Sequence, residues 1–111
     1  MSDEAPIDAL KAAAHPLRFG ILRALRETEL NVGELESASG IGQPSLSQQL
    51  AVLRSAGLVE TRREGKLVFY SIDISAMAAL ADTLAAFAGG RDAISPPRRR
   101  APGAANFARM T

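Results

Sequence analysis

The chain has 111 residues, of which 47% are hydrophobic and 23% charged, and this describes one ordinary globular domain rather than a disordered or fibrous chain. It has no cysteine and one histidine, which excludes disulfides, thiolate metal sites, cysteine nucleophiles and histidine-rich metal sites. The formal net charge is only +1, so any argument from charge must rest on where the charges lie.

The first third of the chain predicts three short helices. Pro6 suits the first turn of a helix over about 7–14. Pro16 interrupts that helix, because proline disfavours helical geometry in the residue before it, and a second helix is expected over about 16–28. Asn31 and Glu34 have the spacing of a capping box and predict a third helix over about 32–38.

A glycine turn, a fourth helix, a hairpin and a last helix follow. Gly40 suits the left-handed conformation that ends a helix, and a fourth helix is expected over about 43–56. Two strands, Leu58–Arg63 and Lys66–Ile72, are expected to be joined by Glu64-Gly65, before a last helix over about 74–88. We therefore predict a mainly α fold with a β-hairpin wing, a winged helix-turn-helix of order α-α-α-α-β-β-α.

The fold is expected to occupy residues 7–88. Residues 1–6 are interpreted as a flexible N-terminus, and residues 89–111, rich in glycine, proline and arginine, as a disordered basic tail. Arg98, Arg99 and Arg100 of that tail could add DNA affinity, but a solvated tail without a role is the simpler reading.

The fourth helix carries an unusual polar face. Short amides and hydroxyls are poor choices for helix stability, yet amides can donate to and accept from the base edges in a DNA major groove. A solvated polar surface is the alternative interpretation. The candidate base-reading residues are Gln43, Ser45, Ser47, Gln48 and Gln49.

Positive charge gathers near the predicted hairpin. Residues 43–72 carry four basic and two acidic side chains, whereas residues 1–42 carry four basic and seven acidic ones. Arg62, Arg63 and Lys66 flank the hairpin tip and could contact the DNA backbone, although a charged tip is often merely solvated. The helix-turn-helix and the basic hairpin together, in this order, favour double-stranded DNA as the partner.

Apolar residues on the first and last helices exceed what so small a core needs, and they indicate a homodimer interface. The alternative is that they cover the protomer's own core. The candidate interface residues are Ile7, Leu10, Met77, Leu80, Ala81, Leu84 and Phe87.

Four stretches together resemble the ArsR-type family of small dimeric winged-helix repressors. They read A-A-A-H-P-L-R-F-G-I-L-R-A-L, E-L-N-V-G-E-L, I-G-Q-P-S-L-S-Q-Q-L-A-V-L-R-S-A-G-L-V and R-R-E-G-K-L-V-F-Y-S-I. The third stretch is similar to the subgroup of sulfide-, persulfide- and biofilm-related repressors and nodulation regulators. The resemblance implies a homodimer that binds a palindromic operator and blocks transcription until a signal releases it. It also places Arg18 near the DNA backbone, although Arg18 could equally tie helices together.

The sensing positions of the family hold other residues here. Asn31 and Gly33 stand where metal sensors have a Cys-x-Cys, and Ser75 and Ala86 stand where a last-helix site, with Asp73 as its first ligand, would have histidines. Arg23 and a position near Ala88 replace the two cysteines of persulfide sensors. We therefore expect no metal site and an effector, if one exists, that does not use thiol chemistry.

The sequence admits other interpretations. The domain could bind a protein after losing DNA binding, but its fourth helix has no acidic residue. An enzyme is not expected, because the sequence has no nucleophile–base pair and no phosphate loop, and it implies no cofactor. His15 is interpreted as structural rather than pH-sensing.

With no apolar run of roughly 20 residues and an acidic N-terminus, we expect a cytoplasmic protein that does not enter the membrane.

Overall fold

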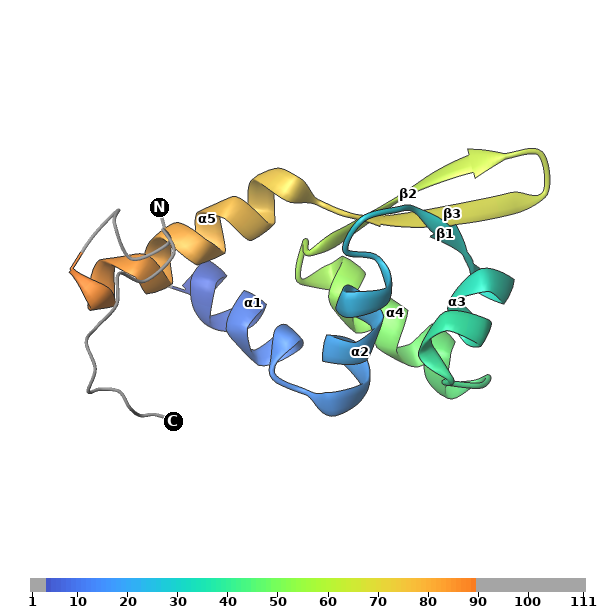
Figure 1. The fold of residues 1–111 in the computed structure, drawn as a ribbon, viewed down its shortest axis with the longest axis horizontal. Coiled ribbons are helices and arrows are strands. Elements are labelled where there is room, and N and C mark those ends of the chain that lie inside the picture. Colours follow the sequence, from blue (N-terminus) through green and yellow to red (C-terminus); the bar gives the residue numbers. More distant parts are fainter. Residues whose placement is uncertain (1–3, 90–111) are drawn as a thin grey trace, which may run out of the picture. The chain divides into compact units, whose positions relative to one another are not determined.

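The computed structural model of the protein describes residues 4–89 (Figure 1). The predicted basic tail, Gly89 apart, therefore lies outside the described residues, as do the first three residues of the predicted N-terminal segment. Helix α1 begins three residues before its predicted start. The helices are α1 (Glu4–Ala13), α2 (Pro16–Ala24), α3 (Val32–Ser39), α4 (Ser45–Ser55) and α5 (Ile74–Ala85). The winged helix-turn-helix fold predicted from the sequence is confirmed.

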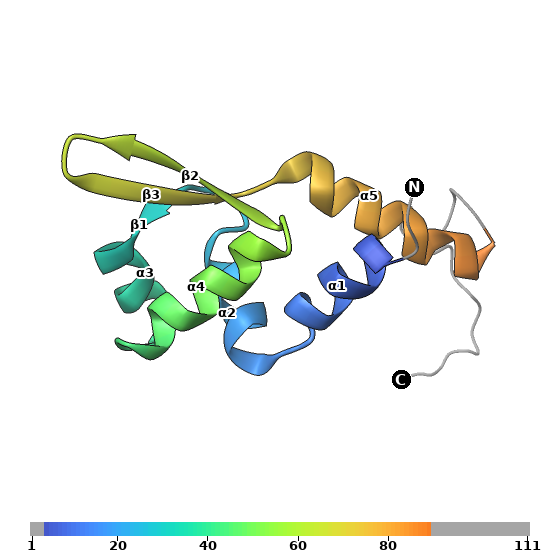
Figure 2. The same cartoon turned by 180° about the vertical axis from the view of Figure 1, so that it is seen from behind.

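The sheet has three antiparallel strands, in the order β1-β3-β2. Strand β2 (Val59–Glu64) and strand β3 (Leu67–Ile72) form the predicted hairpin, which extends beyond the helices in Figure 2. Glu64 pairs with Leu67, so the two-residue link is Gly65-Lys66 rather than the predicted Glu64-Gly65. Gly65 takes a φ of +62° at the first link position, where glycine is favoured in a tight hairpin. Strand β1 (Leu30–Asn31) was not predicted, because two residues are too short to show alternation.

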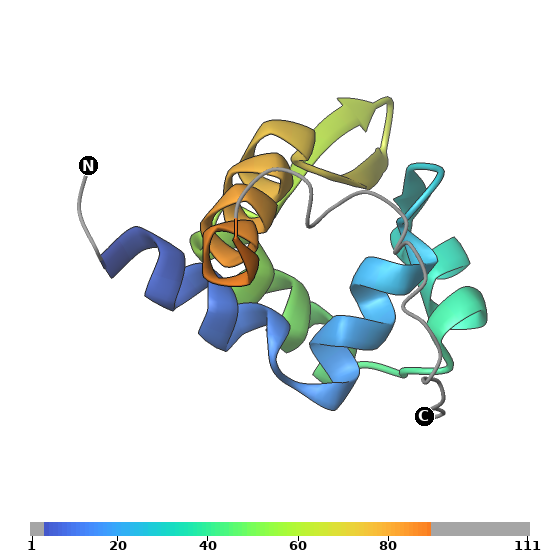
Figure 3. The same cartoon turned by 60° about the vertical axis from the view of Figure 1, so that its left-hand side comes forward.

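Helices α1 to α4 surround one apolar core. Figure 3 shows α2 between α1 and α3. The predicted leucine stripe of α4 is confirmed, since Leu46, Leu50 and Leu53 are all buried, and they meet Ile21 of α2 and Leu35 of α3 there. Apolar burial of this kind stabilises the fold and fixes which face of α4 meets solvent.

Side chains cap the starts of α2 and α3, and a glycine ends α3. Asn31 Oδ1 accepts from the Glu34 amide, and Glu34 Oε1 accepts from the Asn31 amide, both at 2.9 Å, which confirms the capping box. Gly40 ends α3 with a φ of +74°, the left-handed conformation predicted. The imidazole of His15 caps α2, because its Nδ1 accepts from the Leu17 amide at 3.2 Å. These caps set where α2 and α3 begin and where the chain turns into α4.

The last helix is shorter than its predicted span of 74–88. It ends at Ala85, and a 3-10 turn (Ala86–Ala88) follows. The first of two compact units ends at Leu80, and the described part of the second unit contains the end of α5 and that turn. Within residues 4–89, no helix combines the length and apolar character needed to span a membrane.

Candidate nucleic-acid interface

Helix α4 separates an apolar face from a polar one. The leucines at positions 46, 50 and 53 recur at helical spacing and anchor one face in the core. Helix α4 runs from Ser45 to Ser55 rather than over the predicted 43–56, so Gln43 precedes it. Of the predicted base-reading residues, Gln43, Ser47 and Gln48 are exposed and Ser45 and Gln49 are half-buried. The buried leucines therefore anchor one face of α4 in the core, and polar side chains of its first two turns stay accessible to a partner.

The exposed residues of this face differ in whether their side chains form hydrogen bonds within the protein. Gln43 Oε1 accepts from both the backbone amide and the hydroxyl of Ser47, so these two side chains stabilise each other at the start of α4. The side chain of Gln48 has no hydrogen-bond partner within residues 4–89. Its amide can donate to and accept from a base without breaking an internal contact.

The side chain of Gln49 is held by a hydrogen bond from Arg18. The Arg18 guanidinium donates from Nη1 to Gln49 Oε1 at 2.8 Å, from Nε to the Ala12 carbonyl at 2.6 Å and from Nη2 to the Lys11 carbonyl at 3.4 Å. Arg18 thus joins the end of α1 to the middle of α4. Of the two roles open from the sequence, the geometry supports the tie between helices.

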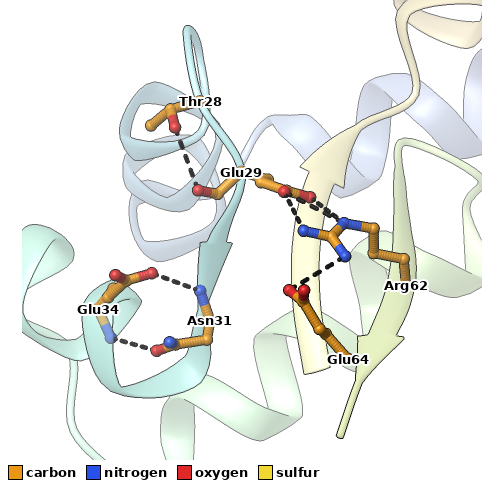
Figure 4. Close-up of polar contacts among 6 residues, drawn as sticks. All are labelled: Thr28, Glu29, Asn31, Glu34, Arg62 and Glu64. Carbon is orange, nitrogen blue, oxygen red and sulfur yellow. Dashed lines mark hydrogen bonds and ion pairs between the residues drawn. The ribbon is translucent and has the colours of Figure 1, made fainter. Parts of the chain in front are cut away.

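The three basic residues of the hairpin have different surroundings. Arg63 and Lys66 are exposed and have no ion-pair partner in the described part of the chain. Arg62 is instead bound to Glu29, with Nη2 at 2.6 Å from Oε2 and Nε at 2.9 Å from Oε1, and its Nη1 lies 3.4 Å from Glu64 Oε1 (Figure 4). Arg63 and Lys66 are therefore available to phosphate, whereas Arg62 is occupied.

The contacts of Arg62 shift two titrations. Its hydrogen bonds lower the pKa of the Glu29 carboxyl below the usual value of 4.5, and the same bonds raise the pKa of Arg62. The Arg62 Cζ also lies 4.8 Å from the centre of the Phe69 ring, a cation–π distance. Sequence reasoning missed Glu29, because nothing in the local pattern connects it with a residue 33 positions away.

The predicted dimer residues fall into two groups. Leu80 is 8% exposed and belongs to the core of its own protomer, and Leu10 and Met77 pack against that core. Ala81 is half-buried. Ile7, Leu84 and Phe87 are exposed, as is Ile74, which the sequence analysis did not select. Among the predicted interface residues, only the exposed ones leave apolar surface that a partner could cover.

A shallow hollow of about 260 Å³ lies between α1, α2 and α4. Val52, Ala12 and Ala56 give it an apolar floor, and it also has both positive and negative groups in its lining, including Arg18. Three N–H groups of the Arg18 guanidinium donate to protein oxygens, which leaves two of its five N–H groups without a protein acceptor among the described residues.

Two residues that the family resemblance connects with sensing have structural contacts. Asp73 Oδ1 accepts from the Ala76 amide at 3.0 Å and so caps the start of α5. Asn31 caps α3. Within residues 4–89, no group of three or more His, Asp or Glu side chains is placed to hold a metal ion.

The comparisons with known proteins agree with this geometry. Residues 15–61, which contain α2, α3 and α4, match the family described as "Bacterial regulatory protein, arsR family". The chain is 51% identical over 75 residues to the biofilm growth-associated repressor of Xylella fastidiosa, covering 68% of this chain and 66%, just under two thirds, of that repressor. It is 45% identical over 75 residues to the transcriptional activator HlyU of Vibrio cholerae, covering 68% of this chain and 69% of HlyU.

The fold has the same relatives. The crystal structure of the transcriptional repressor BigR from Xylella fastidiosa superposes with a TM-score of 0.60 and 45% sequence identity, covering 73% of this chain and 84% of BigR. Sequence and fold therefore agree on one assignment, and the chain belongs to the arsR family of bacterial regulatory proteins.

Proposed function

We propose that the chain is a sequence-specific DNA-binding transcriptional regulator that places α4 in the major groove. The observation that carries this proposal is the exposed face of Gln43, Ser47 and Gln48, held outward by the buried leucines on the opposite side of α4. A helix fits the major groove, and glutamine amides match the donor and acceptor pattern of adenine there. Gln48 is the central base-reading residue of the proposal, because no internal contact of the described chain occupies it.

The regulator acts as a homodimer on a palindromic operator. Two-fold symmetry would place two copies of α4 about 34–36 Å apart, in successive turns of the major groove. The exposed apolar residues of the first and last helices supply the interface, with Ile7, Leu84 and Phe87 as its predicted members and Ile74 added by its exposure. Arg63 and Lys66 of the hairpin bind flanking phosphates.

Repression is the proposed outcome of binding, in the cytoplasm and without a cofactor or catalytic activity. One relative is named a repressor and another an activator. That this chain represses transcription rather than activates it is therefore proposed. The sequence has no cysteine, and an effector of this protein would therefore act through a contact other than a thiol.

A protein-binding winged helix is not favoured. Helix α4 has no acidic residue, and its exposed polar side chains are Ser47, Gln48, Arg54 and Ser55, beside the exposed apolar Ala51 and Val52. This composition suits base edges and phosphates better than the basic surface of a protein partner.

Selection from a random duplex pool tests the proposal. The purified chain should enrich a palindrome whose half-sites are centred 10–10.5 base pairs apart, and it should bind that duplex about a thousandfold or more tightly than a scrambled one. A reporter under the selected operator then reads the direction of regulation. Absence of enrichment, with no binding at low salt, would contradict the proposal and support a protein partner instead.

A further inference from the structure

Arg62 lies across the outer face of the sheet, with 51% of its side chain still exposed. Its strand neighbours alternate in side-chain direction, so Arg62 shares a face with Glu64 and with Phe69, its cross-strand partner on β3. The Arg62 guanidinium lies over the Phe69 ring. It reaches Glu29, just before β1 (Figure 4). One side chain thus spans the three strands of the sheet.

The contacts of Arg62 are those a DNA phosphate would offer. Two oxygens of Glu29 accept from Nε and Nη2 in the paired geometry that a guanidinium also makes with phosphate. Arg63, the next residue, is exposed on the opposite face and has no ion-pair partner within residues 4–89. The hairpin therefore has an occupied arginine beside a free one.

We propose that Glu29 withholds Arg62 from the DNA backbone and so lowers the affinity of the regulator for its operator. Glu29 is a positioning residue that acts through Arg62, and Glu64 assists it from the same strand. This inference rests on the proposed function, because it requires that the hairpin meets duplex DNA. Arg62 still contributes to binding, since it joins β2 to Glu29 just before β1 and so helps to fix the hairpin relative to the helices.

The proposal separates residues that look equivalent in the sequence. Arg63 and Lys66 release counterions when they bind phosphate, and each adds about 0.9 to the steepness of the salt dependence of binding. Arg62, already neutralised by carboxylates, adds nothing to that slope in the natural chain. Removing Glu29 frees Arg62 for a phosphate and makes the slope steeper.

The test is the salt dependence of binding to the selected operator, measured by fluorescence anisotropy from 50 to 200 mM salt. Glu29→Gln should bind more tightly and steepen the slope by about 0.9, so its advantage over the natural chain falls about 3.5-fold across this range. Arg62→Gln should leave the slope unchanged. The double variant Glu29→Gln/Arg62→Gln should show the slope of Arg62→Gln, because the freed cation is then gone.

Glu27→Gln is the matched control. It removes the same charge two residues away, from a carboxylate that lies near Arg26 and not near Arg62. An unchanged slope in Glu29→Gln, or an equal change in Glu27→Gln, would overturn the inference, as would a flatter slope in Arg62→Gln. Thermal unfolding of each variant establishes that it is folded, and Glu64→Gln, which removes only the weaker partner, should give a smaller change of the same sign.

The outcomes also distinguish this inference from the proposed function. If the natural chain binds no duplex, the proposed function fails. If it binds the operator but the slopes of Glu29→Gln and the natural chain coincide, only the role of Glu29 fails.

Discussion

At the scale of single residues, two arginines within residues 4–89 connect segments that are distant in the sequence. Arg18 joins α1 to α4, and Arg62 joins β2 to the segment before β1. Their partners lie 31 and 33 positions away in the chain. Sequence patterns identify a basic residue near a predicted interface, but they do not reveal a partner at that separation, because only the folded chain brings the two together.

Arg18→Ala should lower the free energy of unfolding by about 1–3 kcal/mol, because two backbone carbonyls and the Gln49 amide lose a charged donor. Denaturant unfolding measures this change. Arg26→Ala, which removes a highly exposed arginine paired only at 3.7 Å, is the control and should stay within about 0.5 kcal/mol of the natural chain. Equal effects of the two variants would contradict the proposed tie.

The pKa of the Glu29 carboxyl gives a pH prediction. Because this pKa is lowered in the folded state, the ion pair with Arg62 stabilises the fold above the usual glutamate value of 4.5 and loses that contribution as pH falls through the lowered pKa. An NMR titration of the Glu29 carboxyl carbon should have its midpoint below 4.5, and the midpoint should rise in Arg62→Gln. A midpoint that is the same in Arg62→Gln as in the natural chain would show that Arg62 does not cause the lowered pKa of Glu29.

At the scale of elements, the sequence predicted those with a clear local signal. The capping box, the left-handed Gly40 and the leucine stripe of α4 are each carried by residues close in sequence, and each is confirmed. The hairpin was predicted with its link shifted by one residue, since glycine can serve either turn position. Strand β1 exists only through its pairing with β3, and so has no local pattern to read.

Asn31→Ala tests how much the capping side chain at the start of α3 contributes to stability. The substitution removes the side chain that accepts from the Glu34 amide, and it should destabilise the protein by about 1 kcal/mol. Thermal or denaturant unfolding measures the loss. Ser37→Ala, an exposed change in the last turn of the same helix, is the control and should have little effect. A neutral Asn31→Ala would mean that the capping box does not contribute to the start of α3.

At the scale of the whole molecule, the dimer prediction depends on apolar surface that one protomer leaves open. Residues that the sequence grouped together divide in the structure, because Leu80 completes the protomer core while Phe87 is 87% exposed. Periodicity identifies an apolar helix face but not which protomer covers it. That distinction required the burial of each side chain.

Phe87→Glu should convert the proposed dimer to a monomer, because a charge cannot enter an apolar interface without a partner. Sedimentation of the purified variant should show the monomer mass, and binding to the palindrome should weaken more than binding to a single half-site. Phe19→Glu places the same charge on an exposed aromatic of α2 and is the control. A dimeric Phe87→Glu, or a natural chain that is already monomeric, would contradict the proposed assembly.

The most direct test of the account is the base preference of Gln48→Ala, measured on every single-base variant of the selected operator. We expect a loss of about 1–3 kcal/mol on the best site, relaxed preference at one position in each half-site and an unchanged salt slope. Ser55→Ala, at the far end of α4, should keep the natural preference. Uniform weakening over all sequences, or an unaltered preference in Gln48→Ala, would show that this face of α4 does not read the bases.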